Sequence, residues 1–110
     1  MTTQFSINQS RLCHRLDELA EIGAIEGGGV CRLTLTNEDK HGRDLLIAWM
    51  KELGMTVHVD GIGNIIGVRQ GLEDIPAVMI GSHLDTVSTG GRLDGSYGVL
   101  AGLEVIHTLN

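Results

Sequence analysis

The sequence predicts an α/β fold with a mixed sheet, and three observations lead to this prediction. The expected elements follow the order helix, helix, strand, strand, strand, helix along the chain. The first two strands form a hairpin, whereas the third, a continuous apolar run at residues 77–80, is typical of a strand buried on both faces. Residues 81–98 connect that strand to an apolar helix at residues 99–106. Polar side chains in this connection would stand at the carboxyl end of a buried strand, where α/β sheets place their sites.

Length and composition indicate one globular domain whose partners include neither nucleic acid nor membrane. The 110 residues suffice for a core, and the hydrophobic content of 42% suits a globular protein. A formal net charge of -6, without any cluster of Lys and Arg, argues against nucleic acid and anionic membranes. No apolar run is long enough for a transmembrane helix, and the start lacks the pattern of a secretory signal. Cys13 and Cys31 lack metal-site spacing, which indicates free thiols in a reducing cytoplasm.

The first helix is expected to begin at a cap formed by Asn8 or Ser10 and to extend to about Ile22, where Gly23 ends it. Its apolar stripe consists of Leu12, Leu16 and Leu19. The glycine-rich connection at residues 24–35 alternates too irregularly to predict a strand. An ordered loop of this length either serves a function or packs the first helix as a surface turn, and the sequence leaves both open.

The second helix is expected to follow Thr36 as its cap, with Asp39 near the position that completes a capping box and Gly54 as its end. Its predicted apolar face consists of Leu45, Leu46, Trp49, Met50 and Leu53. Residues 55–60 alternate as a strand, and residues 64–70 return as a second strand after a glycine turn. The side chains expected to face inward from the first strand are Met55, Val57 and Val59. The histidines expected at the surface are His14, His41 and His58, with His107 at the surface or an interface.

The connection after the third strand has the composition of a metal site. His83 and Asp85 alternate along the strand end, so both side chains are expected on the same side. An aspartate in that position can accept the second ring N–H of a metal-bound imidazole and fix its orientation. Asp94 can fold back through a glycine turn as a further carboxylate ligand, and Gly95 permits close backbone approach. Hydroxyls expected to bind these carboxylates belong to Ser82, Thr86 and Ser88.

These residues also admit interpretations other than a metal site. A bare His-x-Asp is a weak signal, because a lone histidine at a strand end is more often a structural residue held by hydrogen bonds. The complete order of apolar strand, His-x-Asp, paired glycines, Asp-Gly and helix favours a metal, since ionisable groups beside a buried strand need compensation. Gly61 and Gly67 are spaced wrongly for a dinucleotide fingerprint. Ser82 and His83, as neighbours on a strand, point to opposite faces, and Cys31 is more consistent with a packed thiol than a nucleophile.

Residues 81–87 (GSHLDTV) and 90–105 (GGRLDGSYGVLAGLEV) resemble the zinc-dependent amidohydrolases of the carbamoylase type. This group contains N-carbamoyl-L-amino-acid hydrolase, allantoate amidohydrolase and β-ureidopropionase, within the wider aminoacylase and zinc-exopeptidase superfamily. The amino-terminal part of that group is also similar to residues 19–24 (LAEIGA), 27–30 (GGGV), 32–39 (RLTLTNED) and 63–64 (GN). The resemblance therefore covers nearly the whole chain.

The resemblance implies a role for each residue of the candidate site. His83 would ligate one metal ion, Asp94 would bridge two, and Asp85 would orient His83. The cofactors would be two divalent ions, with Zn²⁺ as the first choice and Mn²⁺, Co²⁺ or Ni²⁺ as alternatives. In such enzymes a water activated with the help of a glutamate attacks the ureido or amide carbon. The small-molecule substrate would be an N-carbamoyl-L-amino acid or a related ureido compound such as allantoate.

The resemblance also implies that residues 1–110 form only the amino-terminal part of the metal-binding catalytic domain. Members of the group carry a Glu-Glu pair, further histidines and a lid and dimerisation domain, none of which is found in this sequence. We therefore expect a homodimeric parent enzyme and an inactive 110-residue chain. An aminoacylase or dipeptidase specificity and a non-catalytic binding or assembly domain are the alternatives.

Overall fold

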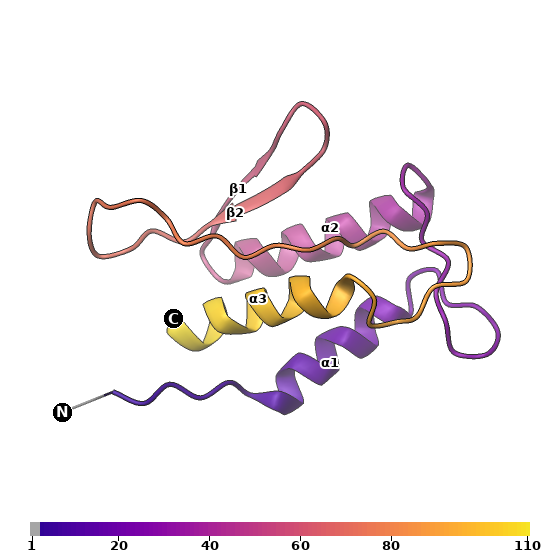
Figure 1. The fold of residues 1–110 in the computed structure, drawn as a ribbon, viewed down its shortest axis with the longest axis horizontal. Helices are drawn as coiled ribbons and strands as arrows, with labels where there is room; N and C mark the ends of the chain where they lie inside the picture. Colours follow the sequence, from indigo (N-terminus) through magenta and orange to yellow (C-terminus); the bar gives the residue numbers. More distant parts are fainter. Residues whose placement is uncertain (1–2) are drawn as a thin grey trace.

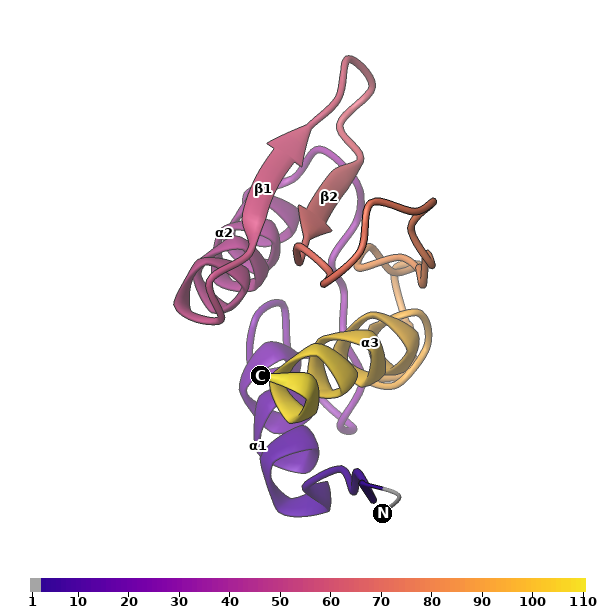
Figure 2. The same ribbon diagram turned by 90° about the vertical axis from the view of Figure 1, so that its left-hand side faces the viewer.

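The structure, a computed structural model, describes residues 3–110 and combines three helices with one two-stranded antiparallel sheet (Figure 1). Helix α1 packs against α3, and the hairpin packs against α2 (Figure 2). The elements are α1 (Gln9–Ala20), α2 (Asn37–Glu52), β1 (Thr56–Val59), β2 (Ile65–Val68) and α3 (Ser96–Leu109). The α/β class is thus confirmed. No helix in the described part of the chain is long and apolar enough to cross a membrane.

The two predicted helix caps are present. The Asn8 side chain accepts a hydrogen bond from the Arg11 amide at 3.0 Å, and α1 ends at Ala20, two residues before the predicted end. The Thr36 hydroxyl accepts from the Asp39 amide at 3.2 Å. The Asp39 carboxylate accepts in return from the Leu35 amide at 3.1 Å, one residue before the position that a capping box requires.

The hairpin consists of the two predicted strands, each shorter than expected. Thr56 pairs with Val68 and Val59 with Ile65, and the Asp60 carboxylate accepts backbone hydrogen bonds within the turn. The expectation that Val59 faces inward is wrong, since 45% of this residue is exposed. The turn end of the hairpin projects away from α2 (Figure 2), and Val59 is the residue of β1 nearest to this turn.

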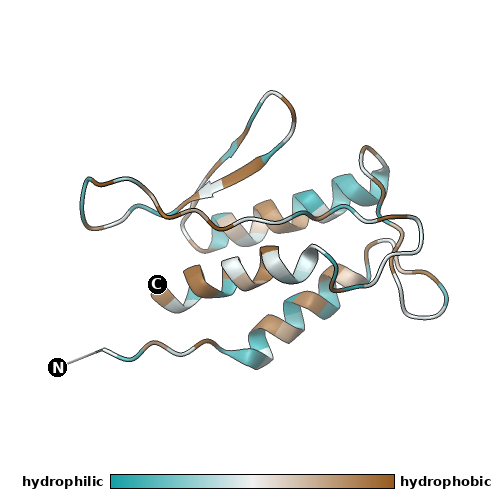
Figure 3. Ribbon diagram, in the orientation of Figure 1, coloured by the Kyte–Doolittle hydropathy of each residue, from teal (hydrophilic) through white to brown (hydrophobic). Residues whose placement is uncertain are grey.

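The third predicted strand does not form within residues 3–110. Residues 76–87 run as an extended segment without a strand partner, and Val78, Met79 and Ile80 are 93%, 85% and 58% exposed. A strand buried on both faces needs neighbours on both sides, and the described residues supply neither. Apolar residues consequently lie along an uncovered segment, as Figure 3 shows. The prediction of a buried strand here was wrong for this part of the chain.

The core lies between the three helices and Leu84, which belongs to the extended segment at residues 76–87. Its buried members are Leu12, Leu16, Leu19, Leu46, Trp49, Leu84, Leu100 and Leu103. The predicted leucine stripe of α1 is therefore confirmed. Helix α3 is longer than expected and buries only one face, which includes Leu100 and Leu103.

A charged cluster joins α1 to α3 beside this core. The Glu104 carboxylate is 1% exposed and accepts from the Arg11 guanidinium at 2.6 and 2.9 Å and from the Asn8 amide at 2.9 Å. Hydrogen bonding from Arg11 lowers the pKa of Glu104 to about 2, although burial opposes this shift. Arg15 lies 3.0 Å from the His107 ring nitrogen, so His107 takes part in the contact between α1 and α3.

Candidate metal centre

The structure brings His83 and Asp85 into contact at the end of the extended segment. The Nδ1 atom of His83 lies 2.9 Å from the Asp85 carbonyl oxygen and 3.4 Å from the Asp85 carboxylate. Both side chains are about half exposed, at 51% and 44%. Because Nδ1 faces Asp85, the other ring nitrogen, Nε2, is left for a further ligand and has no hydrogen bond within residues 3–110.

The start of α3 packs directly against the His83 ring. Gly95 precedes the helix with φ of 68°, a left-handed conformation that glycine tolerates best. A Cβ atom at Gly95 would collide with the ring and the carbonyl oxygen of His83, and one at Gly98 would lie 2.8 Å from Ser82. These two glycines allow the extended segment to reach the helix, and the first of them follows Asp94 immediately.

Asp94 ends a loop that is tied to two other parts of the fold. Gly90 exchanges two backbone hydrogen bonds of 2.9 Å with Val30, and Arg92 forms an ion pair with Asp17 of α1. The carbonyl of Asp94 accepts from the amide of Ser96 at 2.7 Å, and its exposed carboxylate has no hydrogen bond in the described part of the chain. These contacts hold the Asp94 backbone in place, directly before Gly95, which lies against His83.

The hydroxyl that binds the Asp85 carboxylate is not one of the three predicted. Thr34 Oγ1 donates to Asp85 Oδ2 at 2.9 Å. Thr86 is buried and accepts instead from the amide of Arg32 at 2.7 Å, while Ser82 lies against Gly98. The sequence could not identify Thr34, because it lies 51 residues from Asp85 along the chain. The prediction for Ser82, Thr86 and Ser88 is therefore wrong, since none of them binds Asp85 or Asp94 within residues 3–110.

Arg32 is the largest fully buried side chain of the described residues, and no motif in the sequence marks it as a site residue. It is 1% exposed, and its guanidinium donates four hydrogen bonds. Burial lowers the pKa of Arg32, and the charges of Asp39 and Asp85 oppose this shift. The only signal in the sequence is an arginine among small and apolar residues of the glycine-rich connection.

These residues fit a divalent metal ion in type but fall short in number. An imidazole held at Nδ1 and an unpaired carboxylate are donors that zinc and related ions accept. Catalytic zinc normally takes three protein ligands, whereas residues 3–110 contain no group of three or more His, Cys, Asp or Glu placed to hold a metal. His83 and Asp94 therefore form at most part of a metal centre.

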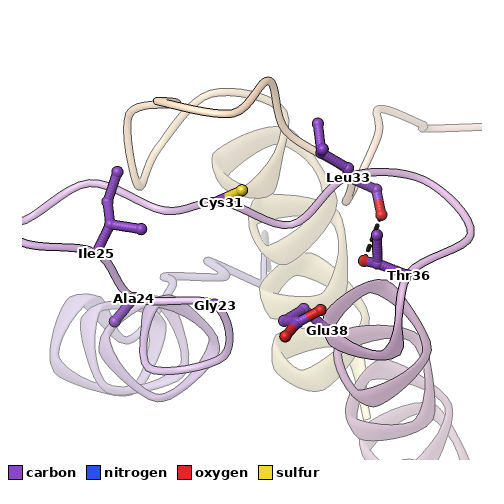
Figure 4. Close-up of a pocket in the computed structure, with 7 residues that line it drawn as sticks. All are labelled: Gly23, Ala24, Ile25, Cys31, Leu33, Thr36 and Glu38. Atoms are coloured by element: carbon purple, nitrogen blue, oxygen red, sulfur yellow. Dashed lines mark hydrogen bonds between the residues drawn. The ribbon is translucent and has the colours of Figure 1, made fainter.

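A surface pocket of the described residues lies away from the candidate centre. It has a volume of about 250 Å³ and lies between the end of α1 and the start of α2 (Figure 4). Its lining consists of Gly23, Ala24, Ile25, Cys31, Leu33, Thr36 and Glu38. No residue of the candidate centre takes part, and the thiol of Cys31 is free, as is that of Cys13.

Known proteins resemble this chain closely, although no family model matches it. An N-carbamoyl-L-amino acid amidohydrolase from Geobacillus stearothermophilus is 47% identical over 94% of this chain and 26% of its own length. A hydantoinase/carbamoylase family amidase from Burkholderia multivorans superposes with a TM-score of 0.94 at 53% identity, over 96% of this chain and 26% of that one. In sequence and in fold, the chain is similar to one part of the hydantoinase/carbamoylase amidases.

Two further relatives show the range of names within this amidase group. An allantoate amidohydrolase from Bacillus subtilis is 37% identical over 86% of the chain, and a ureidoglycolate hydrolase from Arabidopsis thaliana is 34% identical over 99%. The resemblance to carbamoylase-type amidohydrolases is thus confirmed, as is the fold of the corresponding part of the amidases. The chain spans about a quarter of the length of the relatives that it matches.

Proposed function

We propose that this chain contributes His83 and Asp94 to a metal centre that hydrolyses the carbon–nitrogen bond of N-carbamoyl-L-amino acids or related ureido compounds. The observation that carries the proposal is the contact of His83 with Asp85 in a chain 47% identical to a carbamoyl amino acid amidohydrolase. Two divalent ions, with Zn²⁺ as the first choice, are the proposed cofactors.

Each residue of the centre has a distinct task in this proposal. Asp85 holds His83 through Nδ1, which keeps the ring in place and raises the basicity of Nε2 toward the metal. Asp94 would supply a carboxylate ligand to these ions. When bound, such ions polarise the scissile carbonyl and lower the pKa of water.

The remaining groups have to come from outside residues 1–110. The one acid of α3, Glu104, is buried against Arg11 and is not available as a general base. The relatives are about four times as long as the part that this chain matches. We place the general base, the other ligands and the lid and dimerisation domain in a longer, homodimeric protein of the cytoplasm.

The substrate class follows from the names of the relatives. They refer to N-carbamoyl-L-amino acids, allantoate and ureidoglycolate. These compounds share a ureido group, whose hydrolysis releases ammonia. Hydrolysis of an N-acyl amino acid or a dipeptide would release no ammonia. Ammonia release therefore distinguishes a ureido hydrolase from an aminoacylase or dipeptidase.

The test uses the protein expressed from its complete reading frame. Ammonia release is measured with N-carbamoyl-L-methionine, allantoate, ureidoglycolate and N-acetyl-L-methionine, before and after removal of metal by a chelator. We expect turnover of at least one ureido compound that stops on chelation and returns with Zn²⁺ or Mn²⁺. Turnover of the N-acetyl compound alone would support an aminoacylase, and no turnover with any metal would support a non-catalytic domain.

A further inference from the structure

Arg32 connects three segments that lie far apart in the sequence. Its Nε donates to the carbonyl of Leu84 at 3.0 Å, and Nη2 donates to the hydroxyl of Ser96 at 3.1 Å. Nη1 donates to the carbonyls of Leu19 and Ile22, at 3.1 and 2.7 Å. One guanidinium therefore joins the end of α1, the extended segment at residues 76–87 and the start of α3.

The places that Arg32 contacts are the ones that set the geometry of the candidate centre. Leu84 stands between His83 and Asp85, and Ser96 follows Asp94 by two residues. The Arg32 backbone also pairs with this segment, because its carbonyl accepts from the amide of Thr86 at 2.7 Å. The relative position of His83 and Asp94 thus depends on a contact that neither residue makes itself.

The charge of Arg32 is compensated without a direct ion pair. Two of its acceptors are carbonyls at the end of α1, where the helix dipole presents partial negative charge. Asp39 and Asp85 lie close enough to favour the charged guanidinium. Four of its five N–H donors are used, which a buried cation requires.

We infer that Arg32 is a positioning residue of the candidate metal centre. It holds the His83–Asp85 segment and the Asp94–Ser96 turn in fixed positions relative to α1 and to each other. This inference rests on the proposed function. Lysine cannot replace it, because a single ammonium nitrogen offers three donors from one point instead of a planar fork. Loss of the fork releases both segments that carry the ligands.

Arg15 provides a matched control for the loss of a buried arginine. This residue of α1 is 7% exposed and packs against α3 and Trp49. It contacts His107 but no residue of the candidate centre. Arg15→Met therefore removes a buried guanidinium while leaving the contacts of Leu84 and Ser96 intact. Ser96→Ala removes only one of the four hydrogen bonds of Arg32 and is the mild variant if Arg32→Lys and Arg32→Met fold poorly.

The experiment measures Zn²⁺ affinity by competition with a chromophoric chelator and the Co²⁺ absorption spectrum, on the protein expressed from its complete reading frame. Circular dichroism identifies the temperature at which each variant is folded. In the metal-free protein, the ring ¹⁵N and ¹H resonances of His83 report its environment directly. We expect Arg32→Met and Arg32→Lys to weaken Zn²⁺ binding by about tenfold to a hundredfold, the range for groups that orient metal ligands.

The pattern across the variants decides the inference. Ser96→Ala should shift the His83 resonances and the Co²⁺ spectrum with a smaller loss of affinity, whereas Arg15→Met should leave both unchanged. Unaltered His83 resonances in Arg32→Lys and Ser96→Ala, or an equal loss of affinity in Arg15→Met, would overturn it. If the unsubstituted protein binds no metal, the proposed function fails first, and the role of Arg32 in a metal centre fails with it.

Discussion

Asp85 shows how a single carboxylate links two loops to the candidate centre. One of its oxygens accepts from Thr34 at 2.9 Å, and the other lies 3.4 Å from His83 Nδ1. The threonine thereby holds the carboxylate in an orientation that presents its second oxygen to the ring. In the proposed centre, Asp85 would act as a positioning residue whose contribution depends on its negative charge as well as its shape.

We predict that Asp85→Asn retains part of the bound metal but reduces turnover by about tenfold to a hundredfold. The amide keeps the shape of the side chain, whereas the loss of charge weakens its hold on the imidazole. Metal titration and steady-state kinetics measure the two effects separately. Asp44→Asn, at an exposed acid of α2 that pairs with Lys40, serves as the control, and full activity in Asp85→Asn would show that the site is misassigned.

Gly95→Ala is predicted to destabilise the protein and displace His83. Alanine pays about 1–2 kcal/mol in the left-handed conformation, and its Cβ would also collide with the His83 ring. Chemical denaturation and the His83 ring resonances measure both consequences. Gly91→Ala, in the same loop but with open space around it, should be neutral. Equal stability of the two variants would contradict the packing of α3 on His83.

For single residues of the candidate site, the sequence predicts contacts between neighbours in the chain but not contacts between residues far apart in it. The pairing of His83 with Asp85 follows from the alternation of an extended segment. Thr34 and Arg32 bind this segment from 51 and 52 residues away, and local patterns carry no information about such contacts.

The pairing of α1 with α3 shows how an element can bury a charge and remain stable. Glu104 stands in an otherwise apolar helix, where Arg11, Arg15 and the Asn8 amide surround its carboxylate. Removing one partner of such a cluster would leave a buried charge unpaired, which is costly. The cluster therefore fixes the orientation of the two helices beside a leucine core that is not directional by itself.

Glu104 is predicted to make stability depend on pH in the acid range. Its pKa in the folded protein is about 2, below the ordinary value of 4.5, so its stabilisation is present above pH 4.5 and is lost as pH falls toward 2. The shift corresponds to about 3 kcal/mol. Denaturation of Glu104→Gln between pH 2 and 5 should show a flatter pH profile, and exposed Glu18→Gln should not. Identical profiles for the unsubstituted protein and Glu104→Gln would contradict this role.

Leu100→Ala tests the core at the centre of α3. The side chain is fully buried, so its truncation should lower the free energy of unfolding by about 2–5 kcal/mol. Leu72→Ala, at a leucine exposed to solvent, should change it little. Urea denaturation compares the two variants, and similar midpoints would mean that the three helices do not share this core.

The helices, whose starts are marked by local capping residues, form where the sequence predicts them. The third predicted strand, which needs distant partner strands, does not form within residues 3–110. Thr36 and Asn8 mark helix starts because their side chains bind amides within the same turn. The strand expected at residues 77–80 depends on neighbouring strands, which residues 3–110 do not supply. Its apolar composition therefore indicates a strand that is buried within a larger sheet. It does not predict the exposed, unpaired conformation that this segment has within residues 3–110.

The whole molecule combines a finished helical core with an unfinished site. The described residues bury a continuous core, yet the segment at residues 76–83 remains exposed and only two metal donors are proposed among them. Both features agree with a chain that spans a quarter of the amidases it matches. The central claim is that His83 belongs to a metal centre despite this incompleteness.

The most direct test is the metal content of the protein expressed from its complete reading frame, measured by inductively coupled plasma mass spectrometry. His83→Ala is compared with His58→Ala, which removes an exposed histidine of the hairpin. We expect stoichiometric divalent metal in the unsubstituted protein and in His58→Ala, and loss of at least one ion per chain in His83→Ala. Equal metal content in all three proteins would contradict the assignment of the centre.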